Sequence, residues 1–179
     1  MGIKSPLLTR ILPSERNRMS VGAFLSQICC CNDRIEELDR QIAKECRELD
    51  YASRLREIPG CGPVLSSVIA SEIGSISRFP AAANFVSYCR LSSTSRLSNG
   101  KSKGLGNAKN GNAHLSWAFT ELANMMARYD DRAGRYYNRL LARYGGLRVK
   151  AIRVMAAKIA RSVYQCLSKN EPYDVARCF

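Results

Sequence analysis

One stretch of the chain, from Ser95 to His114, holds residue types that could break and join phosphodiester bonds. Its serines, Ser95, Ser98 and Ser102, carry hydroxyl groups that can act as nucleophiles. His114, at the start of an expected helix, could act as a general base or contact phosphate. The cations of the stretch could bind phosphate and stabilise the charge that develops on phosphorus; they are Arg96, Lys101, Lys103 and Lys109.

The backbone of this stretch could approach a ligand closely. Four glycines and four asparagines are spread through it, and both residue types tolerate positive φ. No acidic residue occurs between Glu72 and Glu121, so nothing in the sequence balances the positive charge. A cationic, glycine-rich loop of this kind suits a nucleic-acid backbone. Composition alone leaves open a plain solvated linker.

The positive charge is concentrated in the C-terminal two-thirds of the chain. The 179 residues have a net charge of +13, and a hydrophobic content of 46% is ample for a folded core. Residues 1–57 hold 10 Lys or Arg against 9 Asp or Glu, whereas residues 58–179 hold 18 against 6, a net charge of +12. We therefore expect the second part to have an anionic partner.

The cysteine and carboxylate patterns predict no metal or cofactor site in this chain. None of the eight cysteines forms a C-x-x-C pair, His114 is the only histidine, and the few carboxylates do not converge in the sequence. Without a signal peptide a disulfide framework is not expected, so the cysteines are interpreted as small buried residues of a cytoplasmic protein. No apolar run approaches the ~20 residues of a membrane span, and no membrane partner is expected.

A heptad repeat predicts a long helix in residues 21–57, after a connecting segment in residues 1–20. Apolar residues recur every seven positions, and a second set follows three residues later. The first set is Val21, Ile28, Ile35, Ile42 and Leu49, and the second is Phe24, Cys31 and Leu38. Such a helix could pair with a second copy or with a partner's helix. It could equally pack on its own domain.

The segment Ile58-Pro-Gly-Cys-Gly-Pro63 predicts a tight turn between two helices. Pro63 suits the first turn of the second helix, and Gly74 can end it. This order matches the helix-hairpin-helix pattern, in which glycines such as Gly60 and Gly62 let backbone N–H groups meet a DNA phosphate. A plain turn between antiparallel helices is the alternative.

The remaining pattern predicts helices at about residues 81–89, 113–129, 130–144 and 149–167. The third of these is strongly basic, and Arg135 and Arg139 on it are candidate nucleic-acid contacts. Trp117 is expected in the core, and no stretch shows a convincing strand pattern. We therefore predict an all-α fold, with a long heptad helix followed by a compact helical domain, residues 58–179, that contains the helix-hairpin-helix.

Several short motifs occur in one order and together resemble the C-terminal domain of transposases of the insertion-sequence-110 family (the 110/116/902 group). The resemblance covers about residues 55–174. Each motif is weak alone, and the ordered set is specific. The motifs are Ile58-Pro-Gly-Cys-Gly-Pro63, Glu72-Ile-Gly74, Arg78-Phe-Pro80, Ser98-Asn-Gly-Lys101, Lys109-Asn-Gly-Asn112 and Glu171-Pro-Tyr173.

This resemblance implies that Ser98 is the nucleophile of DNA recombination. The family pattern is Ser-Gly-Gly-Lys, and Asn99 departs from it where the family has Gly. Full-length members also have an N-terminal RuvC-like domain with acidic metal ligands, for which this chain has no room. Mg²⁺ is therefore expected only with a RuvC-like partner domain, and the chain is interpreted as a truncated or split gene product. Structured guide RNA is an implied partner, beside DNA and either a second copy or a partner transposase subunit.

We therefore expect a transposase fragment that binds DNA and carries the serine nucleophile, with completion of recombination left uncertain without a RuvC-like domain. A non-catalytic, basic nucleic-acid-binding module derived from a transposase is the alternative. A structural helical protein that uses its charge to scaffold RNA is a third interpretation.

Overall fold

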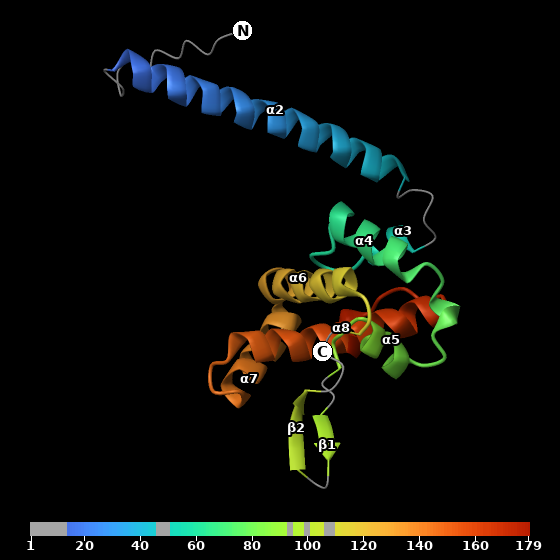
Figure 1. The fold of residues 1–179 in the computed structure, drawn as a ribbon. Coiled ribbons are helices and arrows are strands. Elements are labelled where there is room, and N and C mark those ends of the chain that lie inside the picture. Colours follow the sequence, from blue (N-terminus) through green and yellow to red (C-terminus); the bar gives the residue numbers. More distant parts are fainter. Residues whose placement is uncertain (1–13, 46–50, 93–94, 99–100, 106–109) are drawn as a thin grey trace. The chain divides into compact units, whose positions relative to one another are not determined.

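The computed structural model describes residues 14–45, 51–92, 95–98, 101–105 and 110–179, with the two strands described by their backbone (Figure 1). The chain divides between Lys44 and Glu45 into two compact units, which are described separately. Within the described residues, no helix is both long enough and apolar enough to cross a membrane.

The described residues of the first unit form the helix α2, which spans Glu15–Glu45. It begins earlier than the heptad repeat, because Glu15 favours a helix N-terminus and the Arg18 N–H already donates to the Ser14 carbonyl (3.1 Å). None of its residues is buried. The heptad side chains Phe24, Ile28, Ile35 and Leu38 are 64%, 54%, 54% and 55% exposed. The apolar stripe that the repeat predicts is therefore open to a partner.

The second unit is helical, which confirms the predicted fold class. Its helices are α3 (Ala52–Leu55), α4 (Pro63–Ile73), the 3₁₀ turn η2 (Ile76–Arg78), α5 (Ala82–Tyr88), α6 (Ala113–Tyr129), α7 (Asp131–Arg143), α8 (Arg148–Lys169) and α9 (Val175–Cys178). The bounds of α5 to α8 agree with the predicted helices to within two residues at each end.

The core of this unit forms where α6 and α8 meet. α6 packs against α4, α7 and α8, while α8 also packs against α5. Apolar side chains three and four residues apart are buried on both helices. Buried on α6 are Leu115, Ala118, Phe119, Leu122 and Met126, and on α8 Ile152, Met155, Ala156, Ile159, Val163 and Leu167.

The structure contains a β-hairpin that the sequence analysis missed. Strand β1 (Ser95–Ser98) pairs antiparallel with β2 (Lys101–Leu105), and Ser98 is the partner of Lys101. The register shifts between Ser95 and Leu97. The expectation of a loop without strands is therefore wrong for these residues, while the domain around them remains all-helical. We call residues 95–105 the serine hairpin.

Two predictions of burial are wrong. Trp117 is 49% exposed, because Leu115, Ala118 and Leu122 already occupy the inward face of α6 and Trp117 lies on another side. The cysteines divide into two groups. Cys29, Cys30 and Cys31 are exposed on α2, whereas the buried ones are Cys61, Cys89, Cys166 and Cys178. Burial raises the pKa of Cys61 to about 12. Cys46 lies outside the described residues.

Candidate nucleic-acid interface

Helix α7 exposes a row of arginines because its apolar positions recur on one face only. Ala133 and Leu140 are buried, whereas the arginines, three or four residues apart, are exposed. Asp130 starts the helix by accepting a hydrogen bond from the Ala133 N–H through its side chain (2.8 Å). We call the exposed set the arginine row; it consists of Arg132, Arg135, Arg139 and Arg143.

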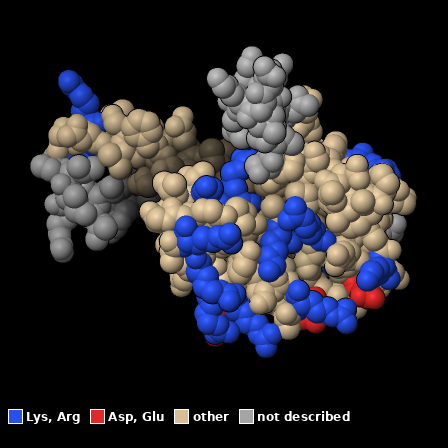
Figure 2. Space-filling model, turned by 90° about the horizontal axis from the view of Figure 1, so that it is seen from below, with Lys and Arg blue, Asp and Glu red and all other residues tan. Residues whose placement is uncertain are grey.

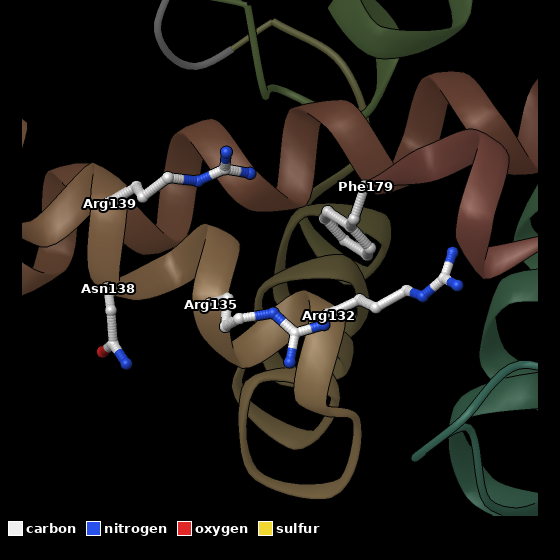
Figure 3. Close-up of a pocket in the computed structure, with 5 residues that line it drawn as sticks. All are labelled: Arg132, Arg135, Asn138, Arg139 and Phe179. Atoms are coloured by element: carbon white, nitrogen blue, oxygen red, sulfur yellow. The ribbon is translucent and has the colours of Figure 1, made fainter.

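Three members of the arginine row line one open hollow of about 590 Å³. Asn138 and Phe179 complete its lining. In Figure 3 the Phe179 ring lies between the guanidinium groups of Arg132 and Arg139. The predicted residues Arg135 and Arg139 are thus brought together with Arg132 around a concave surface that offers several N–H donors. Guanidinium groups grouped in this way match phosphate oxygens in geometry and charge.

Aromatic rings beneath the cations hold this surface in place. The Phe179 ring packs against Tyr136, with 5.2 Å between ring centroids. The Lys158 ammonium lies 4.4 Å from the centroid of Tyr136, and the Arg139 guanidinium lies 5.6 Å from it. Lys150 from α8 lies 4.6 Å from the ring centroid of Tyr144. A cation of α7 and a cation of α8 thus share the Tyr136 ring, which does not neutralise their charge.

Carboxylates do not neutralise the arginine row. In the described part of the chain, the ion pairs are Arg34–Glu37 (2.6 Å) and those of Arg177 with Glu171 (3.2 Å) and Asp174 (3.6 Å). None of them involves α7. Figure 2 shows Lys and Arg side chains gathered over one face with few acidic side chains among them. Such a surface attracts anions from a distance and holds them by direct contact.

Ser98 ends strand β1, and its backbone pairs with that of Lys101. Arg96 belongs to β1 and Lys103 to β2, so the backbone brings these predicted cations into the same hairpin as the serine. The roles predicted for Ser98, Arg96, Lys101 and Lys103 rest on side chains outside the description, and Lys109 lies wholly outside the described residues. These assignments stay predictions.

His114 is exposed in the first turn of α6. The residue that caps this helix is Asn112, whose side-chain oxygen accepts a hydrogen bond from the Leu115 N–H (2.9 Å). His114 therefore does not supply the cap, and its ring is free to contact a ligand at the α6 N-terminus, a place where anions are favoured.

Gly60 and Gly62 have different surroundings in the turn between α3 and α4. Gly60 has φ +81°, and a Cβ on it would lie 2.7 Å from the Met125 Cβ on α6. Gly60 is thus required by packing. Gly62 caps α4 in an extended conformation, with nothing within 4 Å of a Cβ placed there. Its exposed position is compatible with phosphate approaching the N-terminus of α4. The first helix of the expected helix-hairpin-helix, α3, has only four residues. The phosphate-binding role of Gly62 therefore stays a prediction.

The side chains that the structure describes do not fit a metal site. No three His, Cys, Asp or Glu residues among them are grouped so that they could hold an ion. The Mg²⁺ implied by the family resemblance thus finds no set of ligands among these residues.

The sequence analysis missed the contributions of Asn138 and Phe179 to the hollow. Asn138 lies between Arg135 and Arg139 on the exposed face of α7, so the helical period could have identified it. Phe179 reaches the hollow from the far end of the chain, and no local pattern signals that contact.

Comparisons with known proteins relate part of this helical unit to one family. Residues 52–138 match the family described as Transposase IS116/IS110/IS902 family. This range holds the α3–α4 turn, the serine hairpin and the first part of the arginine row. Residues 52–138, just under half of the chain, therefore match a transposase family of insertion sequences, the IS116/IS110/IS902 family.

Two curated relatives are similar over much the same region. An uncharacterized 44.8 kDa protein of insertion element IS116 from Streptomyces clavuligerus is 27% identical over 110 residues, which is 61% of this chain and 28% of the relative. The transposase for insertion sequence element IS1328 from Yersinia enterocolitica is 27% identical over 104 residues, 58% of this chain and 31% of the relative. The chain thus spans about a third of these relatives.

Proposed function

We propose that this chain binds DNA as part of an insertion-sequence transposase, chiefly through phosphate contacts of the arginine row. The observation that carries the proposal is the exposed, concave surface lined by Arg132, Arg135 and Arg139, whose cations have no carboxylate partner among the described residues. Each phosphate that such a surface neutralises releases counterions, so binding must weaken steeply as salt rises.

The test compares two double variants that remove the same formal charge. Arg135→Gln with Arg139→Gln removes two members of the arginine row, and the matched control, Arg16→Gln with Arg40→Gln, removes two exposed arginines of α2. Binding to a labelled duplex is measured by fluorescence anisotropy at several salt concentrations. We expect the first variant to bind at least about tenfold more weakly and to lower the salt slope by about 2, roughly one per lost phosphate contact.

A salt slope that changes equally in both double variants would mean that total charge, not the arginine row, determines binding. No binding of the parent chain at low salt would remove the proposal. Retained melting temperatures in both variants are expected, because all four arginines are exposed.

We further propose that Ser98 is the nucleophile of the reaction. The Ser98 oxygen attacks a backbone phosphorus, a bond from phosphorus to serine forms, and the bond from phosphorus to one sugar oxygen breaks. The serine proton passes to a general base, for which His114 and the lysines of the serine hairpin are the candidates in this chain. The departing sugar oxygen takes up a proton and leaves as a hydroxyl. The family to which residues 52–138 belong supports this role.

The experiment looks for a covalent bond between Ser98 and DNA. The chain is mixed with a RuvC-like half from a related element, its guide RNA and matching DNA, and covalent protein–DNA adducts are separated under denaturing conditions. We expect an adduct that Ser98→Ala abolishes while duplex binding is retained. Ser95→Ala and Ser102→Ala are the matched controls, and loss of the adduct in either one instead would refute the assignment. The chain alone should form none.

A structured guide RNA and a second copy or partner transposase subunit are proposed as further partners, acting in the cytoplasm. The exposed apolar stripe of α2 supports a partner helix, and the arginine row would bind RNA phosphates as well as those of DNA. A non-catalytic nucleic-acid-binding module is the second candidate function. It is favoured by the same arginine row, which needs no reacting group in order to bind phosphate.

A further inference from the structure

We propose that a polar cluster formed by Glu72, Arg78, Tyr88 and Asn112 fixes both ends of the serine hairpin and thereby positions Ser98. This inference rests on the proposed function, because it presumes that Ser98 acts on DNA. The four residues come from the end of α4, the turn η2, the end of α5 and the N-cap of α6. They thus join stretches of the chain that lie up to 40 residues apart.

The chain segments that enter and leave the hairpin are bonded to each other. The Asn112 N–H donates to the Tyr88 carbonyl (2.6 Å), and the Arg90 Nε donates to the Gly111 carbonyl (2.9 Å). From α8, the Arg153 Nη2 donates to the Arg90 carbonyl (2.6 Å). The described ends of the two segments, Tyr88–Arg90 and Gly111–Asn112, are therefore hydrogen-bonded to each other next to the helical core, and we call them the stems. Pairing between β1 and β2 is described again at Ser95 and Leu105.

The Asn112 side chain fixes the returning stem to two helices at once. Its Nδ2 donates to the Glu72 Oε2 (2.5 Å) at the end of α4, and its Oδ1 accepts from the Leu115 N–H (2.9 Å) in α6. An N-cap alone would need only the second bond. The bond to a carboxylate is charge-assisted and stronger than a neutral one.

Arg78 and Tyr88 complete the cluster on the side of the departing stem. The Arg78 guanidinium lies 4.7 Å from the centroid of the Tyr88 ring and 4.6 Å from that of Phe79, and its Nη2 donates to the Glu72 carbonyl (3.2 Å). Hydrogen bonds from Asn112 and then Arg78 lower the pKa of the Tyr88 hydroxyl. The side chains of Asn112 and Arg78 thus both donate to the hydroxyl of Tyr88, which lies just before the segment that leads into β1.

The approach of the two stems leaves no room for a side chain at Gly111. Gly111 has φ +103°, and a Cβ placed on it would lie 2.4 Å from the Tyr88 carbonyl oxygen. Gly146 offers a matched comparison, because its φ is +83° and a Cβ there would meet nothing within 4 Å. A substitution by alanine strains both positions, and only that at Gly111 also forces the stems apart.

A nucleophile on a hairpin is useful only if the hairpin leaves the domain in a fixed direction. The attacking atom must lie about 3–3.5 Å from phosphorus, and a misplacement of about 1 Å can cost about 100-fold in rate. DNA held by the arginine row on α7 is fixed to the helical core. The polar cluster fixes the stems of the serine hairpin to that same core, so it is a positioning device rather than part of the reacting site.

The first test measures the direction of the hairpin without DNA. Spin-labelled amino acids are incorporated genetically at positions 102 and 161, so that the eight native cysteines can remain. Arg161 is exposed on α8. Pulsed electron resonance then gives the distribution of distances between the labels. We expect a narrow distribution in the parent chain, clear broadening in Glu72→Ala and Gly111→Ala, and a narrow one in Glu72→Gln and Gly146→Ala.

A parent distribution as broad as that of Glu72→Ala would overturn the proposal. So would equal broadening in Glu72→Gln, which keeps an acceptor for Asn112, or in Gly146→Ala. The second test uses the adduct assay, in which Glu72→Ala should lower kcat by about 100-fold and leave the Kd for duplex DNA unchanged, with Glu72→Gln restoring most of the rate. If even the parent chain forms no adduct, the nucleophile assignment fails, while the distance measurement still decides the role of the cluster.

Discussion

The two glycines of the turn before α4 allow the helix-hairpin-helix prediction to be tested by substitution. Alanine at Gly60 must adopt φ +81° and place its Cβ 2.7 Å from the Met125 Cβ and 3.1 Å from the Met125 carbonyl carbon. The left-handed conformation costs about 1–2 kcal/mol, and crowding in a packed core adds about 1–3 kcal/mol. We therefore expect Gly60→Ala to destabilise the helical unit by about 2–5 kcal/mol.

Valine at Gly62 meets no such obstacle. Gly62 has φ −72° and ψ −179°, which any residue adopts, and there is open space around a Cβ placed there. Valine is a poorer N-cap than glycine, and the resulting loss is below about 1 kcal/mol. The added side chain would nevertheless cover the N-terminus of α4. If phosphate binds there, Gly62→Val should weaken duplex binding about tenfold and lower the salt slope by about 0.9.

The two measurements are thermal unfolding followed by circular dichroism and anisotropy titrations at several salt concentrations. At about 3 °C per kcal/mol for a unit of this size, Gly60→Ala should lower Tm by roughly 6–15 °C and Gly62→Val by no more than about 3 °C. An unchanged affinity in Gly62→Val would refute a phosphate-binding role for the turn. A fall in Tm as large as that of Gly60→Ala would mean that Gly62 too is structural.

Three further predictions follow from burial and exposure. Sedimentation should give the whole chain a mass of at least twice its own monomer mass, and a chain without residues 1–50 its monomer mass, since the stripe of α2 that contains Phe24 and Ile28 is exposed and a heptad seam needs a second helix. Monomer masses for both chains would contradict this. Trp117→Ala should lower stability by less than about 1 kcal/mol, whereas Phe119→Ala should cost about 3–5 kcal/mol, as judged by urea unfolding. At pH 8 a thiol reagent should modify the exposed cysteines of α2 rapidly and Cys61 only on unfolding, because a pKa of about 12 keeps that thiol protonated until far higher pH; rapid labelling of native Cys61 would disagree.

Periodicity made most of the helical fold predictable. The bounds of α6 are predictable because Leu115, Phe119 and Leu122 repeat with the helical period, and Asn112, a residue type that favours a helix start, precedes them. The arginine row is predictable from the same helical period, because its members lie three or four residues apart on α7. Trp117 departs from the prediction because its angular position on α6 differs from that of the buried Leu115 and Leu122.

The parts that were missed depend on short or distant signals. Strands of four and five residues, rich in Ser, Lys and Gly, carry little β-propensity. The one local sign of the serine hairpin is the Asn99-Gly100 dipeptide, which is typical of two-residue hairpin connections. The bond from Asn112 to Glu72 and the place of Phe179 in the hollow both join residues 40 or more positions apart, where no repeat can indicate contact.

The run Cys29-Cys30-Cys31 would reveal whether two copies of α2 pair in a parallel or an antiparallel direction. Cys31 belongs to the heptad stripe with Ile28 and Ile35, whereas Cys29 and Cys30 point away from it. If two α2 helices run parallel and in register, the Cys31 thiols of both copies face each other in the seam, and mild oxidation would join them there. If the helices run antiparallel, Cys31 of one copy no longer faces its counterpart. Oxidative joining would then depend on the outward thiols, so the cysteine found in the disulfide would report the direction of pairing.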